Sequence, residues 1–335
     1  MSTNALAVDP HADTAGIEDD DDLASETTSV QSSIYKYRYE NGRRYHASNN
    51  DVGSGYWGPN DEKASEHLDI AHNLWLKTLD DKLTLAPLPE KIEKVLDVGC
   101  GTGTWAIDFA ESHPTTTVLG TDISPAQTPP WAPPNCTFEI SDANAYPWPF
   151  AAATFDLVHV RSLFGCVADW PAFYRECARV LKPGGYVEHV EMGRLFKSPD
   201  NSLPADAALV QLDDFGRRAC EAIGKPGDVV YRMRGWLEEE GAGWEDVVQR
   251  EYAWPTGPWP RDPWMKEVGR WSRLHLVEGV ENWCLAMLTR VLGFSYEGAM
   301  EWIERVKREV RDPRIHAYHD MFVCYARKPV AARSE

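Results

Sequence analysis

The chain has 335 residues, of which 43% are hydrophobic and 26% are charged, and its formal net charge at neutral pH is −18. This excess of negative charge disfavours binding to the phosphate backbone of nucleic acids and to anionic membrane surfaces. Because the sequence has no run of about 18 apolar residues and no basic-then-apolar leader, we expect an intracellular protein, cytoplasmic or nuclear, that does not span a membrane.

The first 33 residues differ in composition from the rest of the chain. They contain eight acidic residues and no Lys or Arg, and few of their side chains could pack a core. We therefore expect residues 1–33 to form a disordered acidic tail. The tail either docks protein partners or acts only as a solvating leader, and its composition leaves both readings open.

Residues 34–90 are expected to form a mostly helical N-terminal preface that could cover a ligand as a lid. The segment opens with Tyr and Arg residues up to His46. The sequence at 59–62 is typical of a helix start with Asn60 or Asp61 as the N-cap, and apolar residues recur at helical spacing from 68 to 79.

The next region, residues 91–195, alternates short apolar runs with helical stretches, which is typical of parallel βα units. Apolar character is nearly continuous in two of the expected strands, which indicates a sheet that helices cover on both faces. The expected strands are 94–98, 116–121, 137–140, 155–160 and 186–192, and the expected helices are 102–112 and 170–181.

Residues 196–330 are predicted to form a helical cap together with the closing strands of the same sheet. Eight of the fourteen tryptophans lie between 236 and 302, which indicates a second apolar cluster. The expected helices are 205–223, 228–240, 263–292 and 296–310, and the expected strands are 246–252 and 319–326.

A glycine motif, Asp97-Val98-Gly99-Cys100-Gly101-Thr102-Gly103, lies between the first strand of this region and its helix. Such a loop could hold a dinucleotide, a phosphate or another nucleoside. Its G-x-G-x-G spacing differs from the G-x-G-x-x-G that fits a pyrophosphate. Asp97 would repel a pyrophosphate but would attract a cofactor with an ammonium and a sulfonium group. We therefore predict S-adenosylmethionine, with Asp97 facing the charged donor.

Two further acidic residues follow the next expected strands. Asp122 stands 19 residues after Gly103, where a carboxylate can accept both ribose hydroxyls. Asp142 follows the third strand and could accept from the adenine amino group. The Asp122 placement is shared with NAD sites, so it indicates only a nucleoside.

With these motifs in view, the chain resembles class I methyltransferases and, more closely, the LaeA-like fungal methyltransferases, over residues 27–330. The resemblance implies an α/β sheet of seven strands, one of them antiparallel, S-adenosylmethionine binding, and a role in fungal secondary metabolism. The glycine motif is common to the whole superfamily, whereas the tyrosine- and arginine-rich preface is more specific for the LaeA-like family. The motifs that carry it are residues 39–45, 59–62, 95–103, 122–125, 155–161, 181–185 and 326–329. The predicted cofactor-binding residues are Asp97, Gly99, Gly101, Gly103, Asp122, Ile123, Asp142 and Arg161.

Candidates for catalysis are less specific than those for cofactor binding. Arg161 follows the fourth strand and would orient an anionic acceptor or the cofactor. Glu191 lies near the end of the fifth strand and is the predicted acceptor-side group, with a structural salt bridge as the equal alternative. Tyr45 would fold over the cofactor. A general base is needed only for a protonated acceptor, and the histidine candidates, His72, His316 and His319, are more simply explained as structural.

The sequence shows no signature of a metal site or of nucleic-acid base methylation. The seven cysteines are scattered without a CxxC pair, no carboxylate–histidine metal pattern is visible, and no [DN]-P-P-[YF] follows the fourth strand. Our first hypothesis is a methyltransferase that acts on a small molecule or peptide. The alternatives are a regulator with the same fold that works through protein partners or by methylating protein, and an NAD-dependent oxidoreductase.

Overall fold

The protein is described by a computed structural model that covers residues 37–46, 56–124 and 131–330. The predicted acidic tail, residues 1–33, lies outside these described residues. Within them, no helix is both long and apolar enough to cross a membrane.

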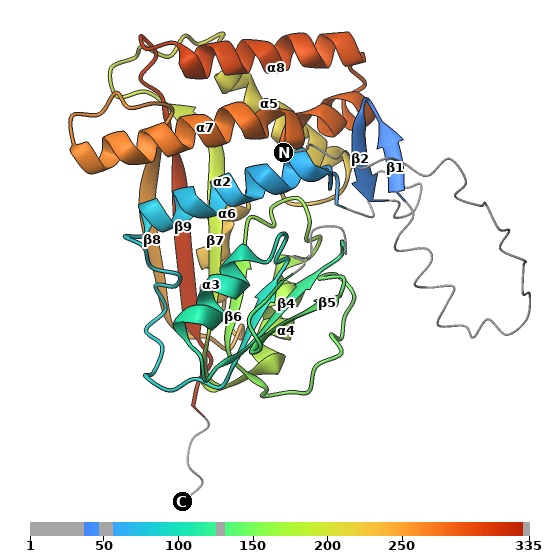
Figure 1. The fold of residues 1–335 in the computed structure, drawn as a ribbon, viewed down its shortest axis with the longest axis vertical. Helices are drawn as coiled ribbons and strands as arrows, with labels where there is room; N and C mark the ends of the chain where they lie inside the picture. Colours follow the sequence, from blue (N-terminus) through green and yellow to red (C-terminus); the bar gives the residue numbers. More distant parts are fainter. Residues whose placement is uncertain (1–36, 47–55, 125–130, 331–335) are drawn as a thin grey trace, which may run out of the picture.

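The centre of the fold is a seven-stranded sheet with the order β5-β4-β3-β6-β7-β9-β8 (Figure 1). Strands β3 to β7 pair in parallel, whereas β9 runs antiparallel to both of its neighbours. This arrangement confirms the predicted α/β class with one antiparallel strand. The strands are β3 (Lys94–Val98), β4 (Thr117–Asp122), β5 (Cys136–Ile140), β6 (Phe155–Arg161), β7 (Leu181–Lys197), β8 (Glu245–Pro255) and β9 (Tyr318–Arg327).

Helices cover both faces of the sheet and extend beyond one end of it. Figure 1 shows α7 and α8 stacked above the upper end of β7, β8 and β9, with α2 crossing below α7. The helices are α2 (Glu62–Thr78), α3 (Thr104–Ser112), α4 (Trp170–Val180), α5 (Ala208–Ala222), α6 (Val229–Glu238), α7 (Pro263–Ala286) and α8 (Tyr296–Arg311). The single helix expected over 263–292 instead ends in a π-helical turn, η2 (Met287–Val291).

Side-chain caps define where four of the helices begin. Asp61 accepts a hydrogen bond from the backbone N–H of Ala64 at the start of α2, as one of the two predicted N-caps. Asp169, Asp262 and Ser295 cap α4, α7 and α8 in the same way. Each cap satisfies a backbone N–H that has no partner within its helix.

The expectation of a mostly helical preface is wrong for its first part. The Tyr- and Arg-rich segment forms a β-hairpin of β1 (Tyr37–Glu40) and β2 (Arg43–His46), not a helix. Asn41 and Gly42 form its turn with φ values of +52° and +74°. Asn-Gly is a strong signal for a two-residue hairpin turn, and the alternation of side chains on either side of it is that of a strand.

The hairpin is anchored to α2 and α7 by a buried arginine. Arg43 donates to both carboxylate oxygens of Asp61, at 2.6 and 2.8 Å, and to Glu281 at 3.0 Å. It also donates to the side-chain oxygen of Asn282 at 2.7 Å. The hairpin is thus fixed against the helical layer by charge-assisted hydrogen bonds.

Candidate functional site

A large cavity opens where the carboxyl ends of the parallel strands meet. Its volume is about 1010 Å³, counting the space open to solvent, and we call it the glycine-loop cavity. Six of the eight predicted cofactor-binding residues line it, the exceptions being Asp97 and Gly103. The lining residues are Tyr56, Leu68, Ala71, Trp75, Gly99, Cys100, Gly101, Thr102, Asp122, Ile123, Ser141, Asp142, Ala143, Asn144, Arg161, Ser162, Leu163, Cys166 and Lys225.

The loop between β3 and α3 needs its glycines for two physical reasons. Gly99, Gly101 and Gly103 have φ values of +71°, +57° and +76°, a region that residues with a Cβ rarely adopt. A Cβ on Gly99 would also lie 2.5 Å from the side chain of Leu163. The loop therefore presents bare backbone to the cavity, with Gly103 as the left-handed N-cap of α3.

Asp122 ties this loop to the end of β4 and faces the cavity. Its Oδ2 accepts from the backbone N–H of Gly101 at 2.9 Å, and its Oδ1 accepts from that of Ser124 at 2.8 Å. Burial raises the pKa of the carboxyl, and the two hydrogen bonds, which lower it, offset only part of this effect. Each oxygen keeps a second lone pair, so the carboxylate can still accept two hydroxyl groups from a ligand.

The end of β5 contributes a second acceptor. Asp142 lines the cavity, and its Oδ1 accepts from the backbone N–H of Asn144 at 2.8 Å. Asn144 in turn bridges to the loop after β6, because its amide donates to Cys166 O at 3.0 Å and its oxygen accepts from Ala168 N. Among the described residues, Oδ2 of Asp142 makes no hydrogen bond, so it is available to a donor such as an amino group.

Arg161 supplies one of the two positive charges of the cavity lining, the other being Lys225, and is held by a relay. Its Nη1 donates to His72 Nδ1 at 3.2 Å, and Nε2 of His72 donates to Asp108 at 2.9 Å. Since a guanidinium can only donate, Nδ1 of His72 accepts in this contact and Nε2 is the nitrogen that donates to Asp108. Burial lowers the pKa of Arg161 to about 10, so it remains charged at neutral pH.

The structure does not place Asp97 on the cavity wall, which corrects its predicted position. Its Oδ1 accepts from Nδ1 of His159 at 2.7 Å, and both side chains are buried. The imidazole stacks on Trp105 with ring centroids 3.7 Å apart. Burial lowers the pKa of His159, and the hydrogen bond to Asp97 opposes this shift. His159 lies 62 residues from Asp97 in the sequence, so no local sequence pattern identifies it as the partner.

Glu191 is a structural carboxylate in this fold and not an acceptor-side group. It is fully buried and lines neither this cavity nor the second one described below. Its Oε2 accepts from the backbone N–H of Phe164 at 3.0 Å and stands 3.5 Å from His189 Nε2. Glu191 thereby fixes the loop that follows β6.

Tyr45 does not fold over the glycine-loop cavity. Its ring is buried in the hairpin, 4.0 Å below the guanidinium of Arg290, and it pairs through its backbone with Pro59. Burial raises the pKa of its hydroxyl to about 12, which makes it a poor proton donor. The lid role expected for this residue therefore has no support in its position.

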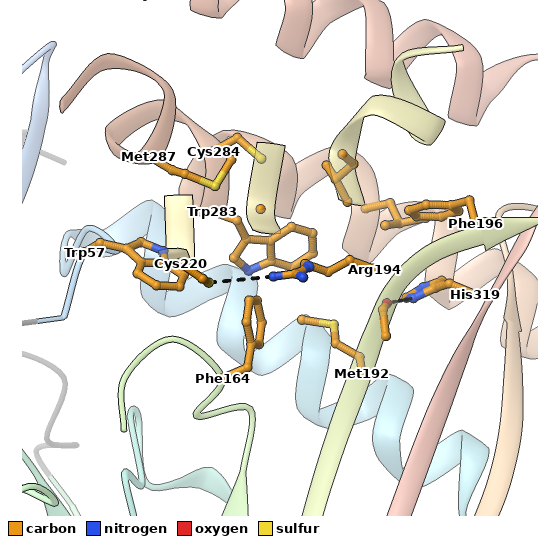
Figure 2. Close-up of a pocket in the computed structure, with 14 residues that line it drawn as sticks. Trp57, Phe164, Met192, Arg194, Phe196, Cys220, Trp283, Cys284, Met287 and His319 are labelled. Atoms are coloured by element: carbon orange, nitrogen blue, oxygen red, sulfur yellow. Dashed lines mark hydrogen bonds between the residues drawn. The ribbon is translucent and has the colours of Figure 1, made fainter. Parts of the chain in front are cut away.

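A second cavity lies against the C-terminal part of β7 and is almost wholly apolar. Figure 2 shows its side chains gathered from β7, α5 and α7, and its volume is about 550 Å³ counting open space. We call it the apolar pocket. Its lining residues are Trp57, Phe164, Met192, Gly193, Arg194, Phe196, Leu212, Gly216, Cys220, Leu276, Trp283, Cys284, Met287 and His319.

Two short segments separate the two cavities, and each contributes side chains to both. Tyr56 and Leu163 line the glycine-loop cavity, whereas their neighbours Trp57 and Phe164 line the apolar pocket. The rings of Trp57 and Phe164 pack edge to face, 5.9 Å apart. A Cβ on Gly165 would lie only 1.9 Å from Trp57. These wall residues belong to no recognisable motif, so the sequence does not predict them as part of a site.

The three histidine candidates have separate structural partners. His72 belongs to the Arg161 relay, and His316 lies by Asp200 at 2.6 Å. His319 lines the apolar pocket, where its Nδ1 donates to Gly193 O at 2.8 Å. Within residues 37–46, 56–124 and 131–330, no group of three or more His, Cys, Asp and Glu side chains could hold a metal ion.

Comparison with known proteins gives a consistent set of relatives. A family model described as a methyltransferase domain matches residues 95–185. Methyltransferase pytC of Aspergillus terreus is 36% identical over 309 residues, which cover 92% of this chain and 93% of pytC. The secondary metabolism regulator LAE1 of Cochliobolus heterostrophus is 35% identical over 87% of this chain and 94% of its own length. The protein-methionine methyltransferase laeA of Emericella nidulans is 32% identical over 88% and 77%.

Proposed function

This chain belongs to the LaeA-like family of fungal methyltransferases, and on that basis we propose that it transfers a methyl group from S-adenosylmethionine to a small molecule or peptide of secondary metabolism. The observation that carries this proposal is the glycine-loop cavity, where bare backbone, two acidic acceptors and one arginine converge. Membership of this family rules against the NAD-dependent oxidoreductase considered as an alternative.

The residues of the glycine-loop cavity fit an S-adenosylmethionine molecule in their chemistry. The backbone of Gly99 and Gly101 allows close approach, since a Cβ would fill the cradle. Asp122 would accept the ribose hydroxyls and Asp142 the adenine amino group. Ile123 lines the same wall and would contact the nucleoside.

Charge in and behind the cavity would orient the amino-acid end of the cofactor. Arg161 would pair with its carboxylate, and the His72–Asp108 relay holds the guanidinium in place. Asp97 would act from behind the loop, where its side chain is held by the hydrogen bond with His159. S-adenosylmethionine supplies a methyl group that its sulfonium has already activated.

The remaining task of the protein is to position an acceptor and to exclude water. The apolar pocket adjoins the glycine-loop cavity, and the side chains of Trp57 and Phe164 would have to part for an acceptor held there to reach the methyl group. An apolar lining removes water from the reacting groups. We assign the acceptor to this pocket.

A regulatory role through protein partners is the second candidate, favoured by the relatives named as secondary metabolism regulators. The acidic segment at residues 1–33 would serve as the docking element. Deleting residues 1–33 distinguishes the two roles. A regulator would lose its complexes after the deletion and keep its affinity for the cofactor, whereas an enzyme would keep its turnover.

The test is calorimetry followed by tracing of a labelled methyl group. We expect the purified protein to bind S-adenosylhomocysteine and not NAD. Incubation with methyl-labelled S-adenosylmethionine and a fungal extract should then move the label into a small molecule or peptide. Binding of NAD without binding of S-adenosylhomocysteine would refute the proposal.

A further inference from the structure

Among the described residues that line the apolar pocket, one carries a charged group, the guanidinium of Arg194. Figure 2 shows this side chain extending from the end of β7 into the middle of the lining residues. Only 12% of its side chain is exposed. A buried charge is costly unless it is paired, so its partners decide what the pocket can bind.

The partners of Arg194 are weak and occupy little of its hydrogen-bonding capacity. Asp213 stands 3.5 Å from Nη2, which is longer than a good hydrogen bond, and the carboxylate is itself 36% exposed. The Nη1 atom donates to the thiol sulfur of Cys220 at 3.8 Å. A guanidinium has five N–H donors, so several remain for an oxygen acceptor. The Phe164 ring lies 5.7 Å from the guanidinium carbon and offers no such acceptor.

The neighbouring helix is built to leave room for this guanidinium. Gly216 lies inside α5, where glycine is unfavourable compared with alanine. A Cβ at this position would lie 2.9 Å from Nε of Arg194 and 3.0 Å from its Cζ. The guanidinium is thus held against bare helix backbone.

Among the described residues that line the pocket, no second positively charged side chain is present to bind an anionic ligand. His319 is the other titratable cation-forming side chain of the pocket, and burial lowers its pKa to about 4. Its imidazole is therefore neutral at neutral pH. Arg194 alone supplies the positive charge among the lining residues.

We propose that the acceptor is an apolar, ring-bearing molecule with one acidic oxygen group, and that Arg194 determines this specificity by pairing with that group. The proposal rests on the proposed function, since it assigns the substrate class of the same methyltransferase. The aromatic and aliphatic lining fits the apolar body of such an acid. A second cavity with apolar walls and no charge would have predicted a neutral lipid-like acceptor instead.

Two probes with the same ring system and different charge test this directly. The full-length protein, saturated with S-adenosylhomocysteine, is titrated calorimetrically with 2-naphthoate and with 2-naphthamide. We expect the wild-type protein to bind the carboxylate at least tenfold more tightly than the amide. Similar affinities for both probes, or no binding of either, would overturn the proposal.

The variants assign this preference to Arg194. Arg194→Met should bring the two affinities within about twofold, and Arg194→Lys should keep part of the preference. Gly216→Ala should weaken only the binding of 2-naphthoate, because it displaces the guanidinium while the charge is retained. Asp213→Asn should strengthen it by removing the competing carboxylate.

The control is Arg232→Met, since Arg232 also stands 3.5 Å from an aspartate, Asp228, but lies outside the pocket lining. This variant should keep the full preference. Binding of S-adenosylhomocysteine by every variant shows that the protein is folded and the cofactor site intact. If the wild-type protein fails to bind S-adenosylhomocysteine, the proposed function fails, whereas loss of the probe preference alone contradicts only the assignment of Arg194.

Discussion

Replacing Asp122 by asparagine tests the centre of the glycine-loop cavity with little change in volume. The amide oxygen can still accept from the backbone N–H of Ser124, which now stands 2.8 Å from Oδ1. The amide nitrogen would face the N–H of Gly101, which now donates to Oδ2 at 2.9 Å. Two donors would then oppose each other, and one ligand hydroxyl would lose its acceptor.

The size of the effect follows from the hydrogen bonds that are lost. A hydrogen bond to a charged group contributes about 1.5–3 kcal/mol, so the free energy of unfolding should fall by about that amount. Losing a similar contact to the ligand should weaken S-adenosylhomocysteine binding by about 10- to 100-fold. Both losses should appear in the same variant.

The control is Asp156→Asn, which removes a carboxylate away from the cavity that also accepts from two backbone N–H groups and, in addition, from Nζ of Lys182 at 3.1 Å. Oδ2 of Asp156 accepts from the N–H groups of Glu93 and Lys94 at 2.8 and 2.9 Å. Urea unfolding should show a comparable loss of stability in both variants, and calorimetry should show weaker ligand binding only for Asp122→Asn. If both variants bind S-adenosylhomocysteine like the wild-type protein, the assignment of Asp122 is refuted.

Three further predictions concern the loop, the hairpin and a buried carboxyl. Gly101→Val should abolish S-adenosylhomocysteine binding in calorimetry, because its φ of +57° is strained for a β-branched residue and its Cβ would enter the ligand path; a folded variant with wild-type affinity would contradict the cradle. Arg43→Met should lower the free energy of unfolding by about 3–5 kcal/mol, because it leaves the largely buried carboxylate of Asp61 without its arginine, whereas Glu281 keeps its pair with Lys63. The affinity for S-adenosylhomocysteine should change less than twofold; a large affinity loss in a stable variant would restore the lid role of the hairpin. Burial raises the pKa of Glu188 from 4.5 to about 7, so the folded state holds a proton that the unfolded chain releases, and stability falls as the pH rises through that window. The free energy of unfolding of Glu188→Gln, measured relative to that of the wild-type protein, should therefore rise by up to about 3 kcal/mol between pH 5 and pH 8, and parallel pH profiles in denaturant unfolding would show that this carboxyl does not titrate there.

The sequence by itself determined the elements and the end of the sheet at which the site lies. Apolar runs, helical spacing and capping residues such as Asp61 are local properties of the backbone, and the structure places the strands within a few residues of the prediction. The positions of Gly99, Gly101 and Asp122 follow in turn, because the carboxyl ends of parallel strands meet at one edge. The Asn41-Gly42 dipeptide also predicts a hairpin turn, but we expected the segment that contains it to be mostly helical.

Only the tertiary structure decided which side chains meet. Asp97 belongs with His159, Glu191 with the N–H of Phe164, and Tyr45 with Arg290. In each pair the partner comes from another element, and its approach depends on how strands and helices pack and not on sequence spacing. The apolar pocket has the same origin, because β7, α5 and α7 contribute to it from segments far apart in the chain. Local periodicity fixes the direction in which a side chain leaves its own helix or strand, whereas the group that it contacts is fixed by the packing of the whole fold.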